Sequence, residues 1–214
     1  MPNWLDYAEL LQQFVPQKLS PDATDCASIW IVLHRNRQPV ALVRDMMMAR
    51  MQSLLDARRL EEARSCGDLL VNAAQQTVAL GQAVGGDSIA DAMQLRSRVY
   101  AAQLDHAAAI KELEDALALA PTSRPYLWVE LARLRHARRH DEPTALAGAA
   151  EAMEAALALL PGAPALWDML SDAFHQLGRA NFSYVPRAIA AVQASARLAP
   201  RATQTWTNLA KASC

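Results

Sequence analysis

The stretch Ala116-Leu117-Ala118-Leu119-Ala120-Pro121 decides the fold, because the chain repeats it twice at nearly the same interval. The later copies are Ala156-Leu157-Ala158-Leu159-Leu160-Pro161 and Ser195-Ala196-Arg197-Leu198-Ala199-Pro200, so that the prolines lie 40 and 39 residues apart. A period in this range indicates a protein built from tandem repeats. Alanine and leucine favour helix and proline stops it, so each stretch predicts the end of a helix.

Aligning the chain on these prolines brings further residues into correspondence. A bulky residue, a leucine and a second bulky residue recur at i, i+3 and i+7, which places them on one face of a helix. A small residue follows the leucine, and small residues recur on the second helix, so the two helices are expected to approach closely. The aligned sets are Trp128, Leu131, Ala132 and Arg135 with Ala149, Met153 and Ala156; Trp167, Leu170, Ser171 and Phe174 with Ala188, Val192 and Ser195; and Met93 and Tyr100 with Ala109, Leu113 and Ala116.

This pattern resembles the tetratricopeptide repeat (TPR), whose signature is a Trp, a Leu-Gly pair, a Tyr, then Ala, Phe and a terminal Pro. The resemblance implies an all-α fold, a right-handed α-solenoid of antiparallel helix pairs that forms a TPR-like superhelix. We expect an N-terminal helical extension or cap at 1–43 and a degenerate TPR-like helix pair at 44–87. Three TPR-like repeats then occupy 88–202, and a C-terminal capping or half-repeat helix, with Trp206 and Leu209, occupies 203–214.

Several positions depart from the usual pattern. The usual period is about 34, and two units carry about five extra residues between their helices, around His140–Thr144 and Asn181–Pro186. Pro143 and Pro186 would then lie near the start of a second helix, where proline is tolerated. Arg96 stands where a leucine is expected, which leaves the register of that helix open by one residue.

The N-terminal part allows two interpretations. Residues 4–14 are amphipathic and predict a helix, and residues 22–25 are suited to cap a second helix that runs through Leu33. In the alternative, Ile29–His34 and Val40–Val43 are the strands of a hairpin. The helical interpretation is favoured because an isolated two-stranded sheet is only marginally stable.

Composition narrows the class of protein. The chain has 214 residues, is 52% hydrophobic and carries a formal net charge of −1, which gives no overall attraction to nucleic acid or anionic lipid. No apolar stretch approaches the length of about 20 residues that spans a bilayer, and the N-terminus lacks the features of a secretory signal. Cys26, Cys66 and Cys214 are odd in number and form no Cys-x-x-Cys pair. They therefore predict neither a disulfide framework nor a zinc knuckle, and a reducing cytoplasm fits best.

Stacked helix pairs leave the first helix of each unit lining a concave groove. The groove should bring Arg133, Asp172 and Lys211 into one row of alternating charge. Two interpretations stay open: a self-satisfied ladder of surface salt bridges, or a polar peptide groove in which Arg98 and Arg133 take a carboxylate. The candidate groove residues are Gln94, Arg98, Tyr126, Val129, Arg133, His136, Asp168, Asp172, His175 and Lys211.

Other clusters are assigned to structure. The basic run Arg133–His140 is interpreted as a solvated helix end, because cations favour helix C-termini and no aromatic residues for base stacking are interleaved with it. His136 and His140 are four residues apart, but Arg138 and Arg139 would repel a cation, so we expect no metal. The run of methionines at 46–48 is assigned to packing between helices. No catalytic constellation and no cofactor site can be named.

These observations favour a non-enzymatic, cytoplasmic scaffold or adaptor that binds a peptide or helix of a partner protein in the groove. Some TPR proteins bind the C-terminal carboxylate of heat-shock chaperones through Lys and Asn, but Gln94, Arg98, Val129 and Arg133 do not match that pattern. The alternative, which the resemblance also implies, is an N-terminal TPR arm that recruits substrate for a larger enzyme, such as a protein glycosyltransferase or sulfotransferase. Self-association through the terminal helices, giving a homodimer, is a third expectation, whereas nucleic acid and membrane insertion are not expected.

Overall fold

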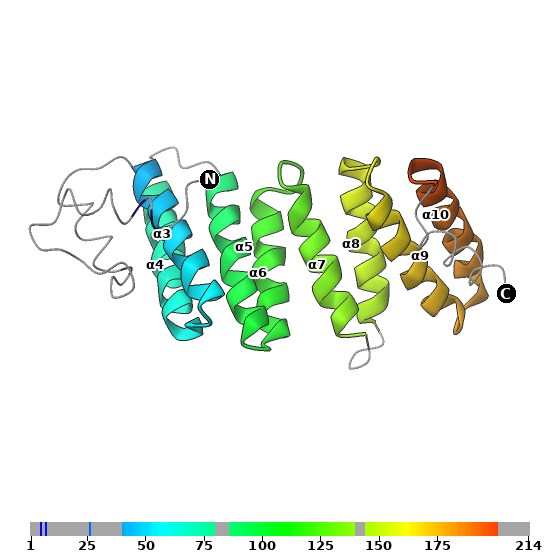
Figure 1. Ribbon diagram of the computed structural model, residues 1–214, viewed down its shortest axis with the longest axis horizontal. Helices are drawn as coiled ribbons and strands as arrows, with labels where there is room; N and C mark the ends of the chain where they lie inside the picture. Colours follow the sequence, from blue (N-terminus) through cyan, green and yellow to red (C-terminus); the bar gives the residue numbers. More distant parts are fainter. Residues whose placement is uncertain are drawn as a thin grey trace, which may run out of the picture. The chain divides into compact units, whose positions relative to one another are not determined.

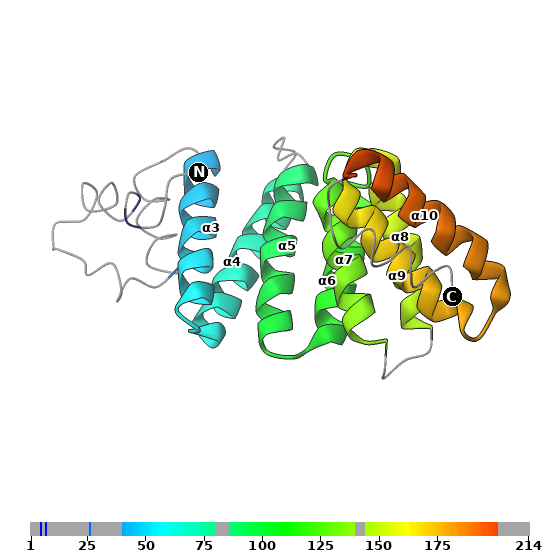
Figure 2. The ribbon, with the colours of Figure 1, turned by 45° about the vertical axis from the view of Figure 1, so that its right-hand side comes forward.

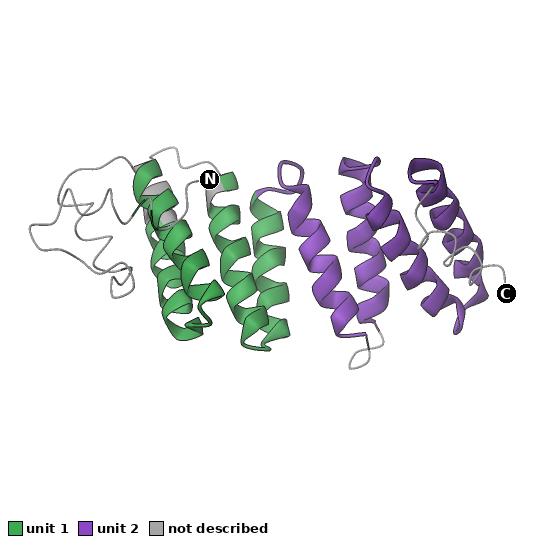
Figure 3. Cartoon of the chain, viewed as in Figure 1, with its two compact units in different colours: residues 1–119 green, residues 120–214 purple. Residues whose placement is uncertain are grey.

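The computed structural model describes Leu5, Tyr7 and Cys26 together with residues 40–79, 86–139 and 144–200. Every regular element in these residues is a helix, as the sequence predicted. The chain divides into two compact units, residues 1–119 and residues 120–214 (Figure 3). Each unit is built from antiparallel helix pairs, so the fold is an all-α solenoid.

The first unit contains α3 (Val40–Asp56), α4 (Leu60–Ala79), α5 (Gly86–Ala102) and α6 (His106–Leu119). Each helix packs against the next one along the chain, and consecutive helices run in opposite directions (Figure 1). Because Val40–Val43 forms the first turn of α3, the alternative in which these residues are a strand is wrong. The other strand of that alternative, and the helix predicted through Leu33, lie outside the described residues.

Gly67 allows the helices of this unit to approach closely. An ideal Cβ at Gly67 would lie 2.8 Å from Cε of Met51 on α3 and 3.1 Å from Cγ of Arg96 on α5. Met51 is fully buried. The neighbouring methionines Met46 and Met47 are also fully buried, which confirms that the methionine run is packing and not an exposed surface.

The second unit contains α7 (Pro125–Ala137), α8 (Ala145–Leu159), α9 (Pro164–Gly178), the short 3-10 helix η1 (Phe182–Tyr184) and α10 (Val185–Leu198). Helices α7 and α8 form one antiparallel pair, and α9 and α10 form another (Figure 2).

The prolines end the second helix of each pair, as predicted. Helices α6, α8 and α10 end at Leu119, Leu159 and Leu198, each two residues before the proline. Prolines also open helices, because the first turn has no use for their missing N–H. Pro125 and Pro164 do so in α7 and α9, and Pro186 stands in the first turn of α10 as the sequence indicated. Pro143 lies outside the described residues.

Small buried residues mark the helix crossings within each pair. The residue after the leucine position is almost fully buried in three first helices, namely Ser97, Ala132 and Ser171. The partner helices present equally buried small residues, and Ser195 Oγ donates a hydrogen bond to the Pro164 carbonyl oxygen at 3.2 Å. The buried small residues of the second helices are Ala109 and Ala116, Ala149 and Ala156, and Ala188 and Ser195.

Trp128 and Trp167 occupy matching places in the second unit. The indole Nε1–H of Trp128 donates to the Pro121 carbonyl oxygen at 2.9 Å, and that of Trp167 donates to the Pro161 carbonyl oxygen at 3.0 Å. Each indole therefore reaches back to the proline that precedes its helix pair. The equivalence of these two tryptophans is confirmed, whereas Trp206 lies outside the described residues.

The insertion near Asn181 forms η1 and packs against the preceding helix. The Asn181 side chain accepts a hydrogen bond from the Ser183 N–H at 3.0 Å. Tyr184 stacks on Phe174 of α9, with 5.8 Å between ring centroids, and the Arg187 guanidinium lies 4.3 Å from the centroid of the Phe174 ring. The five added residues thus extend the contact between α9 and α10.

Candidate functional site

A side-chain contact joins the two first helices of the second unit. His136 Nε2 of α7 lies 3.5 Å from Asp172 Oδ2 of α9, and Gln176 Nε2 donates to the same carboxylate oxygen at 2.7 Å. The first contact joins two helices that are not consecutive in the chain, and the second lies within α9. The His136–Asp172 contact therefore brings the end of α7 against the middle of α9.

The predicted groove residues of this unit belong to α7 and α9 and are exposed or half-buried. Tyr126 and Arg133 of α7 are exposed, and Val129 and His136 are half-buried. Asp168, Asp172 and His175 of α9 are half-buried. The sequence paired Asp172 with Arg133, its equivalent one repeat earlier, but the contact that the structure describes is with His136, one helical turn further along. The row was to continue to Lys211, which lies outside the described residues.

In the first unit, the predicted groove residues lie on α5. Arg98 is exposed and Gln94 is half-buried, and the backbone carbonyl of Gln94 accepts a hydrogen bond from Ser97 Oγ at 2.7 Å. Helix α5 also packs against α3, the other first helix of this unit. The two first helices of the first unit are thus neighbours.

Sequence reasoning missed the equivalent residues of α3. Met47 corresponds to Met93, which places Asp45 and Gln52 at the positions of Asp91 and Arg98. Asp45 accepts from Arg44 at 2.8 Å, and Gln52 donates to Asp56 at 2.8 Å. The signal that finds them is the separation of nine residues between Leu54 and Ala63, which equals that between Tyr100 and Ala109.

Two arginines of the basic run at the end of α7 donate hydrogen bonds to backbone carbonyl groups within the fold. Arg135 donates to the Gly148 carbonyl oxygen of α8 at 3.0 Å. Arg139 donates to the His136 carbonyl oxygen at 3.1 Å, in the last turn of its own helix. A cation in the last turn of a helix also interacts favourably with the negative end of the helix dipole. These contacts support the prediction of a helix end, and His140 lies outside the described residues.

Arg96 forms an ion-pair cluster that joins three helices of the first unit. Its guanidinium donates to Glu112 of α6 at 2.6 and 2.9 Å and to Asp68 of α4 at 3.0 Å. The Arg96 and Glu112 side chains are only 15% and 9% exposed. Burial raises the pKa of Glu112 although its hydrogen bond and charge interaction with Arg96 lower it. Since Met93 and Ser97 are buried on either side, the aligned register of α5 is correct and Arg96 takes the leucine position.

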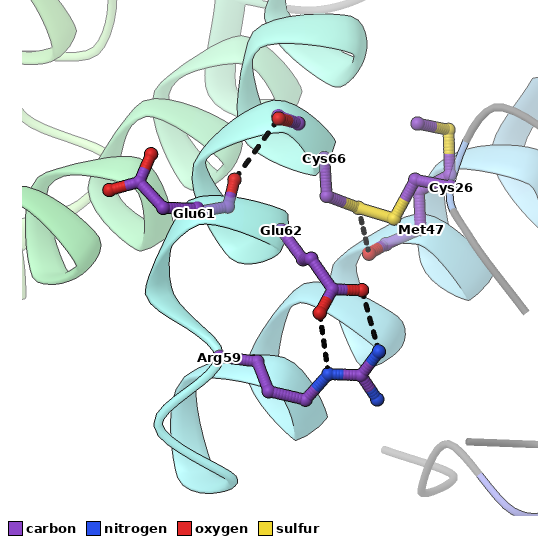
Figure 4. Close-up of a disulfide and its surroundings, with 7 residues drawn as sticks. Cys26, Met47, Arg59, Glu61, Glu62 and Cys66 are labelled. Carbon is purple, nitrogen blue, oxygen red and sulfur yellow. Dashed lines mark hydrogen bonds and ion pairs between the residues drawn. A yellow bond between two sulfur atoms is a disulfide. The ribbon is translucent and has the colours of Figure 1, made fainter. Parts of the chain in front are cut away.

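Cys26 and Cys66 form a disulfide, although the sequence predicted no disulfide framework (Figure 4). Their Cα atoms are 5.3 Å apart, and the two residues are separated by 40 positions in the sequence. Both cysteines line a pocket of about 330 Å³ together with Leu54, Glu61, Glu62, Ser65 and Leu69. The spacing rules applied to the sequence consider nearby cysteines, so no local motif reveals this pair. Cys214 lies outside the described residues.

No group of three or more His, Cys, Asp or Glu side chains in the described residues is arranged to hold a metal ion. None of the helices there combines the length and the apolar character that crossing a membrane requires.

No protein-family model and no curated protein matches the chain. Among solved structures, the TPR-like repeats of a Podospora anserina protein named as a kinesin light chain are 17% identical with a TM-score of 0.59, covering 78% of this chain and 83% of that one. The MamA protein is 14% identical with a TM-score of 0.59 and coverage of 92% and 91%. A TPR protein of the thermophile Thermus thermophilus is 15% identical with a TM-score of 0.54 and coverage of 98% of each chain.

At these identities the likeness concerns the fold and not the activity. It agrees with the paired helices, the buried small residues at the crossings and the terminal prolines described above. The chain therefore has the tetratricopeptide-repeat fold.

Proposed function

We propose that the chain is a non-enzymatic interaction scaffold that binds a peptide or a helix of a partner protein along the exposed faces of its first helices. The observation that carries this proposal is the contact between His136 of α7 and Asp172 of α9. Because this contact brings two first helices together, a partner segment can lie across both. Recognition along a groove of this kind uses side chains spaced along the partner segment.

The chemistry of the surface supports a partner segment of mixed character. Arg133 is exposed and offers a planar cation to a carboxylate. Tyr126 is 37% exposed and offers an apolar ring with a polar end. Asp172 is already engaged by His136 and Gln176, so it fixes the surface in place more than it attracts a ligand. We therefore expect an acidic group near Arg133 and an apolar side chain near Tyr126.

The test compares two double variants with the same change of charge. Arg98→Glu/Arg133→Glu reverses one exposed cation on a first helix of each unit. Lys111→Glu/Arg197→Glu reverses one exposed cation on a second helix of each unit, α6 and α10. Proteins recovered by each tagged variant from a lysate of the source cells are quantified against wild type by mass spectrometry. We expect the first variant to lose, at least tenfold, partners that the second variant retains.

Equal recovery of every partner by both variants would exclude the groove and direct attention to the second helices or the ends. Circular dichroism of both variants verifies that helical content is unchanged. The affinity of any partner that only the first double variant loses is then measured with purified proteins. An Arg133→Lys variant should bind this partner more weakly than wild type but more tightly than Arg133→Glu. A lysine keeps the charge but loses the paired donors of arginine.

The enzyme-arm alternative requires the same groove, since a substrate polypeptide would take the place of the partner. The length of the native reading frame separates the two, because several hundred further residues would favour the arm. Self-association through the terminal helices is a separate question, which light scattering of a Trp206→Glu variant answers.

A cytoplasmic location stays part of the proposal, and the Cys26–Cys66 bond bears on it. Disulfides persist in oxidising compartments and are transient in reducing ones. Alkylation of free thiols during cell lysis, followed by peptide mass analysis, measures the oxidised fraction in the cell. Full oxidation would contradict a cytoplasmic location, whereas a mixture of oxidised and reduced protein agrees with it.

A further inference from the structure

The Cys26–Cys66 bond is buried, but both of its residues line a pocket. Cys66 is fully buried and Cys26 is 5% exposed. The pocket of about 330 Å³ that both residues line is partly open, and Figure 4 shows the Glu62 side chain near the bond, with the Glu61 carboxylate on the side of α4 that faces away from it. A volume of this size lies within the range of small-molecule sites. A small thiol therefore has a path to a disulfide that the fold otherwise covers.

The rim of this pocket carries negative charge. Glu62 forms a bidentate ion pair with Arg59, with both distances 2.6 Å, so its charge is matched. Glu61 accepts a hydrogen bond from the neutral amide of Gln103 at 2.9 Å, which leaves the negative charge of Glu61 uncompensated by this contact. A negative rim repels anions that enter the pocket, and salt screens the repulsion.

The position of the Cys66 sulfur suits it to act as the leaving group when the disulfide is reduced and to re-form the bond on oxidation. Its Sγ lies 3.5 Å from the Met47 carbonyl oxygen of α3. A disulfide sulfur carries no hydrogen, but a Cys66 thiol at the same place can donate one to this oxygen. The reduced form of Cys66 thus has an acceptor waiting within its own helix pair.

We propose that Cys26–Cys66 is a reversible thiol–disulfide exchange site, entered through this pocket and selective for dithiol reductants of low negative charge. A reductant thiolate attacks Sγ of Cys26 and forms a mixed disulfide. The bond to Cys66 breaks, and its sulfur leaves as a thiolate that takes a proton. The second reductant thiol, after losing its proton, displaces Cys26, which is protonated in turn. The dithiol becomes a cyclic disulfide, and the protein gains two thiols by a two-electron reduction.

The experiment measures the reduction rate of the oxidised full chain in native buffer. Dithiothreitol is the neutral dithiol, and samples are quenched by alkylation and read by mass. Two monothiols of similar size, 2-mercaptoethanol and 3-mercaptopropionate, attack as a monoanion and a dianion respectively. We expect a rate that rises in proportion to dithiothreitol concentration and a preference for 2-mercaptoethanol of at least threefold, corrected for thiolate fraction and reduced by about 1 M salt.

Two variants test the route and the charge. Leu69→Trp narrows the pocket and should slow reduction several-fold, whereas Leu198→Trp, at an exposed leucine of the second unit, should not. Glu61→Gln should remove most of the discrimination against the dianion, and Glu151→Gln on α8 should leave it unchanged. Global unfolding rates are measured for each variant, so that faster reduction caused by unfolding is distinguished from entry of the reductant through the pocket.

The proposal fails if reduction proceeds at a rate independent of reductant concentration and equal to the global unfolding rate. It also fails if the oxidised protein forms no Cys26–Cys66 bond, or if Leu69→Trp and Glu61→Gln behave like their matched controls. Removing reductant and adding oxidised dithiothreitol should restore the bond. Failure to restore it in folded protein would overturn reversibility.

Discussion

Arg96 shows how one residue can depart from a repeat pattern and still occupy the patterned place. A leucine there would pack among its neighbours, whereas the arginine reaches across to Glu112 and Asp68. The desolvation of buried charges is offset only while they remain paired. The cluster therefore ties α4, α5 and α6 together, but makes each of its members sensitive to loss of the others.

We expect Arg96→Leu to destabilise the protein by about 3–5 kcal/mol, because it leaves the Glu112 carboxylate buried without its cation. The double variant Arg96→Leu/Glu112→Leu should lie much closer to wild type, since an apolar replacement of a whole pair is often neutral or stabilising. Glu62→Gln, which breaks the exposed pair with Arg59, should cost at most about 1 kcal/mol. Urea unfolding at neutral pH measures all three.

The contribution of Glu112 to the free energy of unfolding depends on pH, and the direction of its pKa shift gives the sign. Its pKa in the folded protein is raised above the ordinary value of 4.5, so its stabilising contribution is fully present below pH 4.5. That contribution is lost as the pH rises through the higher folded value. Arg96→Leu should steepen this loss because the cation that lowers the pKa is gone. An equal pH profile in Arg96→Leu and in the double variant would show that Glu112 does not carry the effect.

Residues with a local signal were predictable, and residues defined by a distant partner were not. Trp128 and Trp167 follow from the repeat interval alone. Arg96 was noticed only as an exception, because its partners lie 16 and 28 positions away in sequence. The Cys26–Cys66 pair had no local signal at all. The pairing of Asp172 with His136 was missed by one helical turn, because equivalence between repeats is not the same as contact.

At the level of the helices, the turns within the first two pairs share an unusual backbone. Arg58 and Leu104 have positive φ angles of 60° and 65°, and each follows the last patterned residue of its first helix, Leu54 or Tyr100, by four positions. The left-handed region costs a residue with a side chain about 1–2 kcal/mol. Leu104 is 79% exposed, so packing does not repay this cost.

Leu104→Gly should therefore stabilise the protein by about 0.5–1 kcal/mol, because glycine adopts this conformation freely and little packing is lost. Ala118→Gly, at an exposed site in α6, is the matched control and should destabilise by about 0.5–1 kcal/mol. Thermal and urea unfolding give both values. A destabilised Leu104→Gly would mean that the exposed leucine makes a contact of its own.

Helix ends were the most predictable elements. A proline both removes an N–H and restricts the residue before it, so its effect does not depend on the rest of the fold. The turns were less predictable, since neither Arg58 nor Leu104 is a residue that favours positive φ. The 3-10 turn at η1 could be anticipated as an insertion, but its stacking on Phe174 depends on tertiary contacts.

For the whole molecule, the repeat architecture limits how far a local change spreads. In such arrays each repeat contacts only its neighbours, so stability is close to a sum of local terms. The chain divides into two compact units of this kind. Damage in one unit should therefore be felt most within that unit.

Hydrogen exchange tests this expectation with the Arg96→Leu variant. Amides of α4, α5 and α6 should lose protection by about a hundredfold or more, in line with the expected loss of stability. Amides of α8, α9 and α10 should change much less. The same loss in both units would mean that the chain unfolds as one cooperative block.

The class of the molecule was readable from the sequence, whereas its specificity was not. The interval between prolines identifies stacked helix pairs, and stacked pairs imply a surface for partners. The residues of that surface follow from helix periodicity, but their pairing depends on how neighbouring helices cross. A partner is absent from the sequence, so no residue pattern can name it.

The indole groups of Trp128 and Trp167 each tie a new helix pair to the proline just before it. The distance along the chain from proline to tryptophan is seven residues in one case and six in the other, while the hairpin inside a pair varies by about five. Residues can thus be inserted between the two helices of a pair without changing the tryptophan–proline contact that joins it to the preceding residues. Insertions in such a protein are therefore expected between the two helices of a pair, where a longer loop can form new contacts without disturbing the packing between pairs.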